Sequence, residues 1–346
     1  MLEHTRRTPG KPEALDPGEK RMAKGRVVVG LLSIGILLAG LGGAAAQSKY
    51  PTQTIKLIVP FAAGGGVDAY ARILAQTVKE KHNIDMIVEN RPGANGTIGG
   101  LGVMRADPNG YTLLFSASTH VMAKQVMQNS PYDPVADFAA VARVGEAPML
   151  VVMNPRRPQK NISEVVADMK SNPKNWEFGI AALGAMGHLA TIGFGHLGGV
   201  TLTTVPYRGT APALNDVAAG HAQLLIDPII ALLPMAQSGN VKALAITTPK
   251  RSKLAPKIPT AAEAGMPGLE FVSWYGVWGP KTMPKELVST INGLFNEAVK
   301  EVAASGRLDT LGIEAVTETP QLFDAYIARD VARNSELLKA AKFQPM

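Results

Sequence analysis

The chain has 346 residues, no cysteine and a formal net charge of +7. The lack of cysteine excludes disulfides and thiol chemistry. The positive balance is modest, and no basic run alternates with aromatic residues, which argues against a nucleic-acid partner. The length is large for one hydrophobic core and suits two domains.

The first 46 residues predict export. A short basic segment, 22–26, precedes the apolar run 27–43, and three alanines end at Ala46, as in a secretory signal peptide with an A-x-A cleavage site. We expect cleavage after Ala46 and place the true start at Met22. The alternative is a membrane anchor, but the apolar run contains five glycines and lies beside the cleavage pattern. Cleavage would remove seven basic and four acidic residues and lower the net charge to +4.

From residue 47 onward, short apolar runs alternate with helical patterns, which predicts an α/β protein. The first unit is expected to hold the following strands and helices: strands 55–59, 85–89, 111–115, 140–144 and 149–153; helices 68–81, 98–106 and 121–126.

A second unit is expected to begin near residue 149. Its predicted elements are as follows: helices 162–170, 188–197, 211–219 and 230–237; strands 176–180, 203–206, 223–227 and 243–247. A further strand is expected at 271–279. The helices expected at 284–304 and 320–341 need a sheet to cover, so we expect this part of the chain to return to the first unit. This predicts domain 1 as residues 47–148 plus 275–346, domain 2 as 149–274, and a ligand cleft between them.

The strand at 55–59 is followed by Gly64-Gly65-Gly66 and then by a helix. Glycines let the backbone curl and leave no Cβ in the way of a ligand. The helix directs unpaired N–H groups and the positive end of its dipole into the loop. Such a corner favours an anion, usually a carboxylate or a phosphate.

Several segments together resemble one family. They are Ile58-Val-Pro-Phe-Ala-Ala-Gly-Gly-Gly66 with Asp68 and Arg72, Glu89-Asn-Arg-Pro-Gly-Ala-Asn-Gly96, Asp107-Pro-Asn-Gly-Tyr-Thr-Leu113, Tyr132-Asp-Pro with Asp137-Phe138, Gly187-His-Leu189, Pro206-Tyr-Arg-Gly209, Asp227-Pro228 and Ser273-Trp-Tyr-Gly-Val-Trp-Gly-Pro280. In this order and spacing they resemble the Bug family, the substrate-binding proteins of tripartite tricarboxylate transporters. The resemblance covers nearly all of the chain after residue 46.

The resemblance implies a periplasmic, two-lobed fold like a type II periplasmic binding protein. Such a protein closes around a small organic acid and delivers it to the membrane permease subunits of a tripartite transporter. The ligand carboxylate is expected to be held largely by backbone N–H groups and ordered waters. Ligand-binding residues are predicted at Phe61, Gly64, Gly65, Asp68, Ser116, Ser118, Thr119, Leu183, Gly184, Ala185, Arg208 and Asp227.

One loop departs from the family pattern, which places serine or threonine there. This chain has Ala182, Leu183, Ala185 and Met186 in that loop. Backbone donors remain while hydroxyl donors are missing, so we expect a ligand with some apolar surface rather than a short, highly polar diacid.

Individual residues leave alternatives open. Asp68 is either a helix N-cap or a ligand-site group that organises a bridging water or binds an ammonium or hydroxyl of the ligand. Asp227 follows an apolar strand and is expected at the edge of the cleft. Arg208 either steers anions or forms a surface or hinge ion pair.

No catalytic residue, metal or cofactor is predicted. The sequence has no Gly-x-Ser-x-Gly elbow and no Walker lysine, and His188 and His196 are eight residues apart instead of at the spacing of a zinc motif. We expect a monomer that is not an enzyme. The alternatives are a ligand-presenting sensor for a membrane signalling protein such as a sensor kinase, an exported hydrolase or lyase, and a cell-surface interaction protein.

Overall fold

The computed structural model describes residue 10 and residues 50–345. The predicted signal peptide, its cleavage after Ala46 and the start at Met22 lie outside the described residues. The chain from Gln53 onward forms one compact unit, to which the following description refers.

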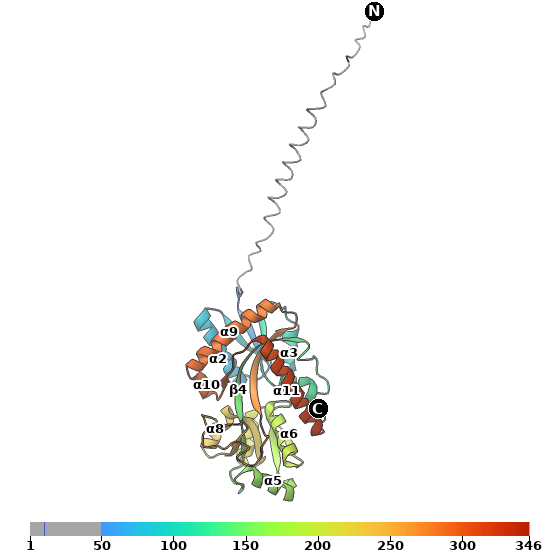
Figure 1. Cartoon of the computed structure of the whole chain (residues 1–346), viewed down its shortest axis with the longest axis vertical. Helices are drawn as coiled ribbons and strands as arrows, with labels where there is room; N and C mark the ends of the chain where they lie inside the picture. The colour runs from blue at the N-terminus through green and yellow to red at the C-terminus, as the bar shows by residue number, and fades with distance from the viewer. Residues whose placement is uncertain (1–9, 11–49, 346) are drawn as a thin grey trace, which may run out of the picture. The chain divides into compact units, whose positions relative to one another are not determined.

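This unit is an α/β structure with two lobes, as the sequence predicts (Figure 1). The strands of lobe 1 are β1 (Ile55–Val59), β2 (Met86–Asn90), β3 (Thr112–Ala117), the first half of β4 (Phe138–Met153), β9 (Val272–Pro280) and β10 (Glu314–Ala315). Its helices are α2 (Gly66–His82), the 3-10 turn η1 (Ala94–Gly96), α3 (Thr97–Met104), α4 (Ala123–Val126), α9 (Lys285–Ala304), α10 (Arg307–Thr310) and α11 (Pro320–Ala340).

Lobe 2 is built around the second half of β4. Its other strands are β5 (Glu177–Ile180), β6 (Thr203–Pro206), β7 (Leu224–Pro228) and β8 (Lys242–Ile246). Its helices are α5 (Ile162–Ser171), the 3-10 turn η2 (Pro173–Asn175), α6 (Met186–Gly198), α7 (Thr210–Ala219) and α8 (Ile229–Gln237).

All ten strands belong to one sheet with the order β2-β1-β3-β9-β4-β7-β5-β6, and β8 and β10 add to β4. Strand β4 is therefore shared: its first half pairs with β9 and its second half pairs with β7 and β8. The prediction of two strands, 140–144 and 149–153, was wrong, because β4 is one strand of 16 residues. The register of the β4–β9 pairing shifts near Ala140 and near Arg143. Each shift accommodates an extra residue of β4, so the strand continues without a turn.

Side chains on the two faces of the sheet pack on different helices. Trp274 and Tyr275 are successive residues of β9 and therefore point to opposite faces. The Trp274 ring contacts Phe323 of α11, whereas Tyr275 contacts Tyr70 of α2. Hence α2 lies on one face of lobe 1, with α9 packed against it, and α11 lies on the other.

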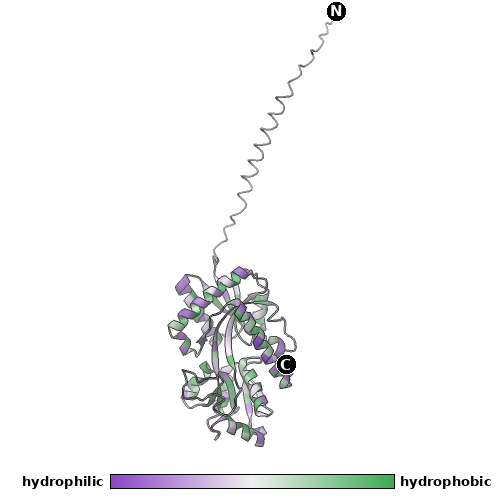
Figure 2. Ribbon diagram, viewed as in Figure 1, coloured by the Kyte–Doolittle hydropathy of each residue, from purple (hydrophilic) through white to green (hydrophobic). Residues whose placement is uncertain are grey.

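The same alternation along β4 separates the two cores of lobe 2. Leu150 and Val152 pack with α7 and α8, while Val151 and Met153 pack with α5 and α6. The core on the α6 side is continuous with lobe 1, since it also contains Leu114 and Trp278. Figure 2 shows the result in the helices, which carry hydrophobic and hydrophilic residues along the same ribbon.

Helix α11 packs on β4, as expected for a helix that returns to lobe 1, but it also packs on α6 of lobe 2. The side chain of Leu337 reaches the position of Gly193, and the ring of Phe343 lies against His188 at 5.3 Å between centroids. The predicted domain boundaries near residues 148 and 274 stay a prediction, because the chain from Gln53 onward is one compact unit.

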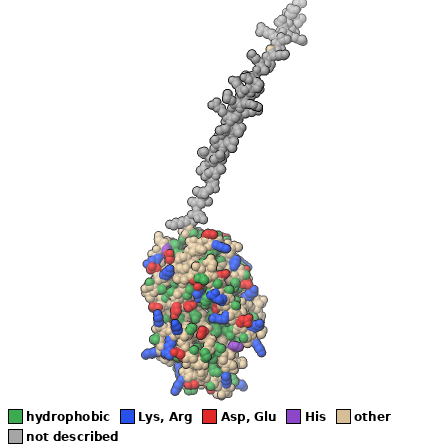
Figure 3. All heavy atoms as spheres, viewed as in Figure 1, with side chains coloured by type: hydrophobic (Ala, Val, Ile, Leu, Met, Phe, Trp, Pro, Cys, Tyr) green, Lys and Arg blue, Asp and Glu red, His purple; other side chains and the backbone are tan. Residues whose placement is uncertain are grey.

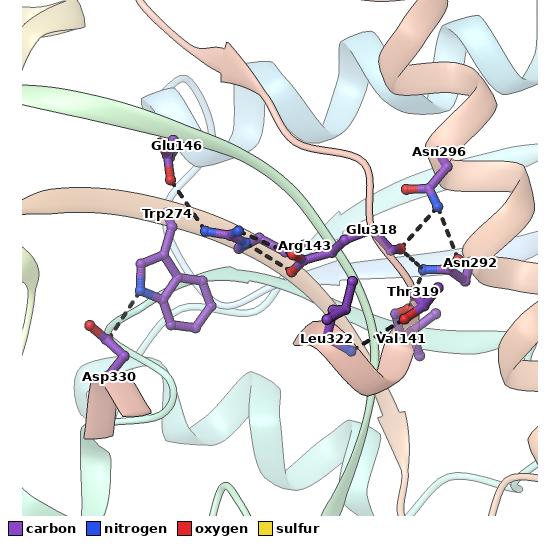
Figure 4. Close-up of polar contacts among 10 residues, drawn as sticks. All are labelled: Val141, Arg143, Glu146, Trp274, Asn292, Asn296, Glu318, Thr319, Leu322 and Asp330. Carbon is purple, nitrogen blue, oxygen red and sulfur yellow. Dashed lines mark hydrogen bonds and ion pairs between the residues drawn. The ribbon is translucent and has the colours of Figure 1, made fainter. Parts of the chain in front are cut away.

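A group of polar side chains fixes lobe 1 beside the shared strands (Figure 4). Arg143 of β4 donates to both carboxylate oxygens of Glu318, at 2.9 and 3.1 Å, and to Glu146 at 3.2 Å. Asn292 of α9 donates to the carbonyl oxygens of Val141 and Glu318 at 2.8 and 2.9 Å. These contacts join α9, β4 and the segment before α11.

The core of lobe 1 leaves no room for a side chain at Gly276 of β9. A Cβ there would lie 2.5 Å from Phe323 Cζ and 2.8 Å from Trp278 Cη2, and both rings are buried. We expect Gly276→Ala to lower the free energy of unfolding by about 1–3 kcal/mol, the usual cost of overpacking. Urea denaturation measures this. Gly293→Ala in α9 is the control: a Cβ there meets nothing within 4 Å, so stability should be unchanged or slightly higher. Equal losses in both variants would contradict the packing described here.

Candidate functional site

The carboxyl ends of the parallel strands of both lobes meet at the junction between the lobes. Strands β1, β2 and β3 are parallel to one another in lobe 1, and β5, β6 and β7 are parallel in lobe 2. The last residue of β7, Pro228, pairs with Met149, next to Pro148, which pairs with β9. Loops at such strand ends are the usual ligand sites of α/β folds. Every predicted ligand-binding residue lies at or just after one of these ends.

The glycine corner follows β1. Gly64 has a φ of +83°, which favours glycine, and its N–H donates to Asp68 Oδ2 at 2.8 Å. That N–H is therefore used within the protein and is not open to a ligand. Gly65 is the N-cap of α2, and its N–H has no partner among the described residues. The first N–H groups of α2 come next in the chain. They have no carbonyl acceptor within the helix, because the helix begins there.

Lobe 2 lies directly across this corner. A Cβ on Gly66 would be 3.8 Å from Cγ2 of Ile230, at the start of α8. The first turns of α2 and α8 therefore approach each other at the junction.

Asp68 holds the corner in place. It is buried, lies in the first turn of α2, and accepts hydrogen bonds from Asn90 at 2.9 Å and Arg72 at 3.1 Å as well as from Gly64. Burial alone would raise the pKa of Asp68, but the bonds from Arg72, Gly64 and Asn90 outweigh it, so the pKa is lowered and the carboxylate is charged. The alternative of a helix N-cap was wrong, because Gly65 occupies that position.

Asn90 also binds the other side of the corner, donating to the carbonyl oxygen of Phe61 at 3.1 Å. Phe61 is half-buried, while Gly64 and Gly65 are exposed. The first lobe thus presents a fixed corner whose exposed part is backbone.

The end of β3 supplies hydroxyl groups. Ser116, Ser118 and Thr119 are all buried, and the hydroxyl oxygens of Ser116 and Ser118 have no hydrogen-bond partner among the described residues. The N–H of Ser118 donates to the carbonyl oxygen of Trp274 at 3.0 Å, which holds this turn against β9. Buried hydroxyls without a protein partner are uncommon and normally bind water or a ligand.

In lobe 2, the loop after β5 carries Leu183, Gly184 and Ala185. Gly184 has a φ of +69°, and its N–H donates to Nδ1 of His188 at 3.0 Å. Burial lowers the pKa of His188 to about 4, so its ring is neutral and Nδ1 can accept this bond. Ala185 is the N-cap of α6, so this loop also ends at a helix N-terminus.

Two residues that hold this loop were not among the predicted site residues. His188, which was considered in the sequence only for its spacing to His196, accepts the Gly184 N–H. Asn95 donates to the carbonyl oxygen of Leu183 at 2.9 Å. The only signal for Asn95 in the sequence was its position in the segment 89–96, which resembles the family.

Asp227, at the end of β7, is a buried carboxyl without a cationic partner. It accepts a short hydrogen bond from the Thr210 hydroxyl, and its Oδ1 would be 2.8 Å from a Cβ on Gly187. Burial raises the pKa of Asp227 to about 7, against a smaller opposite effect of the Thr210 bond. Arg208, after β6, is exposed and forms no ion pair among the described residues, so the alternative of a surface or hinge ion pair is not seen there.

A cavity of about 620 Å³ lies elsewhere in lobe 2. It is lined mainly by apolar side chains of α8, β8 and the segment 254–258, and it contains none of the predicted site residues. On the face in Figure 3, acidic and basic side chains alternate without a large patch of one sign.

Within residues 50–345, no helix is both long and apolar enough to cross a membrane.

A family model described as tripartite tricarboxylate transporter family receptor matches residues 70–343. Protein BugT of Bordetella pertussis is 32% identical over 308 residues, which cover 88% of this chain and 94% of that protein.

Two solved structures are similar along nearly their whole length. A protein of R. palustris solved with adipate has 31% identity and a TM-score of 0.79, covering 86% of this chain and 100% of the other. MatC from Rhodopseudomonas palustris, with bound malate, has 29% identity and a TM-score of 0.75, covering 84% of this chain and 100% of the other.

The environment of Asp227 predicts a pH dependence of stability. The carboxyl of an unfolded chain titrates near pH 4, whereas in the folded protein the pKa of Asp227 is about 7. The folded state therefore holds this proton more tightly, and the contribution to stability is complete below about pH 4 and is lost as the pH rises to 7. The resulting decrease in the free energy of unfolding is of the order of a few kcal/mol, and we expect Asp227→Asn to remove it.

Urea denaturation at pH 4.5, 5.5, 6.5 and 7.5 measures this slope. Asp133→Asn is the control, because hydrogen bonds from Lys124 and from backbone N–H groups lower the pKa of Asp133 and move its titration below this range. A slope between pH 4.5 and 7.5 that is identical in wild type and Asp227→Asn would contradict the assignment.

Proposed function

Because the chain belongs to the tripartite tricarboxylate transporter receptor family, we propose that it is a periplasmic solute-binding protein that captures a small organic carboxylate between its lobes and delivers it to a membrane permease. Members of this family are receptors and not enzymes. The predicted signal peptide supports export to the periplasm.

The observation that carries the proposal is the free N–H of Gly65 at the N-terminus of α2, directly across the junction from α8. An N–H group at a helix N-terminus favours a negative charge, through both its hydrogen bond and the helix dipole. The unpartnered hydroxyls of Ser116 and Ser118 lie at the end of β3, which is next to β1 in the sheet. These groups supply donors for a carboxylate without a basic side chain.

The lining of lobe 2 favours a ligand with an apolar stretch. Leu183 and Ala185 are half-buried and provide methyl groups in place of hydroxyls. Among the relatives, one was solved with adipate and another with malate. Because adipate has four methylene groups between its carboxylates, we expect an acid of that kind to bind this chain more tightly than malate.

Binding requires no covalent step. Closure of the lobes excludes water from the carboxylate, and each hydrogen bond to a charged group contributes roughly 1.5–3 kcal/mol. Three or four such bonds together contribute about 5–12 kcal/mol, a range that includes the roughly −8 kcal/mol of micromolar affinity. The membrane permease would then distinguish the closed, loaded protein from the open one.

A panel of organic acids tests the proposed function. Mono- and dicarboxylates of four to eight carbons, including adipate and malate, are added to the purified protein, and the midpoint of thermal unfolding is measured. A ligand at 100 times its dissociation constant adds about 2.7 kcal/mol of stability, so a binding acid should raise the midpoint by several degrees. Matching amides without charge are the control. A panel in which no acid shifts the midpoint would contradict the proposal.

The role of the Gly65 N–H can be tested by removing that donor alone. Gly65 has a φ of −79°, which proline can adopt, and a Cβ there meets only Ala62 O at 3.7 Å. We expect Gly65→Pro to weaken binding of the acid found in the panel by about 10- to 100-fold, because one charged hydrogen bond is lost. Gly65→Ala keeps the N–H and should stay within a few-fold of wild type. Isothermal titration measures both, and equal affinities of the two variants would place the anion site elsewhere.

A further inference from the structure

Asn95 forms a direct hydrogen bond across the junction of the lobes. Its Nδ2 donates to the carbonyl oxygen of Leu183 at 2.9 Å. Asn95 belongs to the loop after β2 in lobe 1, and Leu183 to the loop after β5 in lobe 2. Among residues 50–345, no other side-chain hydrogen bond joins these two loops.

The backbone around Asn95 is held in an unusual conformation. Four successive residues, 93–96, have positive φ values of 123°, 44°, 54° and 88°. Two of them are not glycine, and such a conformation persists only where the surroundings over-determine it. Here the N–H of Gly96 donates to Gly93 O at 2.9 Å, and the Thr97 hydroxyl donates to Ala94 O at 2.7 Å. These bonds fix the loop that carries the Asn95 amide.

The loop that carries the acceptor, Leu183, also packs closely against lobe 1. A Cβ on Gly184 would lie 2.8 Å from Val126 Cγ2 and 3.4 Å from Met122 Cβ. The side chain of Leu183 packs against the core that contains Met122 and Val126. Opening the lobes at this point would break the Asn95 bond and expose Leu183 at the same time.

We propose that Asn95 is a positioning residue that holds the lobes closed over the bound carboxylate and thereby slows its release. This inference rests on the proposed function. A ligand enclosed at the junction leaves only when the lobes separate, so a bond that joins the two lobes acts on the dissociation rate. Asn95 makes no contact with the corner at Gly65 among the described residues, so its effect is exerted through Leu183.

The variants Asn95→Gly and Asn95→Asp test this role. Glycine and aspartate both tolerate a positive φ, and neither has the donor. Asn83→Gly is the matched control, because Asn83 has a φ of +53° and is exposed at the C-terminus of α2. The chain has no cysteine, so Lys174→Cys and Lys300→Cys, exposed and one in each lobe, can carry spin labels without background labelling.

Two measurements are made on each variant. Pulsed electron resonance gives the distance between the labels, with and without saturating adipate, and stopped-flow dilution gives the adipate dissociation rate. We expect both Asn95 variants to lose closed population and to release adipate about fivefold faster, which corresponds to about 1 kcal/mol. Association rates and the Asn83→Gly variant should match wild type.

Unchanged distances and release rates in both Asn95 variants would overturn the inference, as would equal changes in Asn83→Gly. Failure of the proposed function looks different, because wild type itself would then bind no acid. In that case the distances without ligand still decide whether Asn95 holds the lobes together.

Discussion

The pairing of β4 with β9 is the constraint on which the rest of the structure depends. These two strands extend through the centre of the fold, and β4 alone pairs with strands of both lobes. The loops of lobe 1 and lobe 2 can face each other only because this shared pair sets the direction of each half-sheet. The polar contacts of Arg143 with Glu318 and Glu146 then fix the part of β4 that lies just before the junction. Trp274 of β9 is fixed in the same region by its bond to Asp330, at 3.1 Å.

The proposed site is made mainly of backbone. Gly65 offers an N–H group and the loop 182–187 ends at the N-terminus of α6, whereas the charged side chain of Asp68 binds groups within the protein. Asp68 binds Gly64, Arg72 and Asn90, and its carboxylate is thereby neutralised within lobe 1. This arrangement suits a receptor that must release its ligand unchanged, because main-chain donors bind an anion without a residue that could attack it or transfer a proton to it.

Much of the fold was predictable from the sequence, since hydrophobic alternation and turn residues determine it locally. The strand at 55–59, the strand at 203–206 and helix 285–304 agree with the structure to within a residue. The main error was at β4, where the expected strands 140–144 and 149–153 left a break that contains Gly145 and Pro148. A turn is avoided because the pairing with β9 continues through both residues, with a register shift absorbed beside Gly145. Non-local pairing of this kind leaves no local signal.

The site was less predictable for the same reason. Glycine-rich loops and serines at strand ends are visible in the sequence, so Gly65, Ser116 and Ser118 could be predicted as ligand-binding residues. The contact of Asn95 with Leu183 joins residues 88 positions apart, and the bond of His188 to Gly184 depends on the exact start of α6. The raised pKa of Asp227 likewise follows from burial, which becomes visible only once the lobes are assembled.

Helix α11 has a practical consequence for anyone who handles this protein. Its last turns and Phe343 press on α6 and on the ring of His188, which in turn accepts the N–H of Gly184. The C-terminal end is therefore one side chain away from the loop 182–187, which we propose to meet the ligand. An affinity tag fused there, or a truncation that removes Phe343, would disturb that loop. Purification handles and immobilisation points belong on an exposed loop of lobe 1.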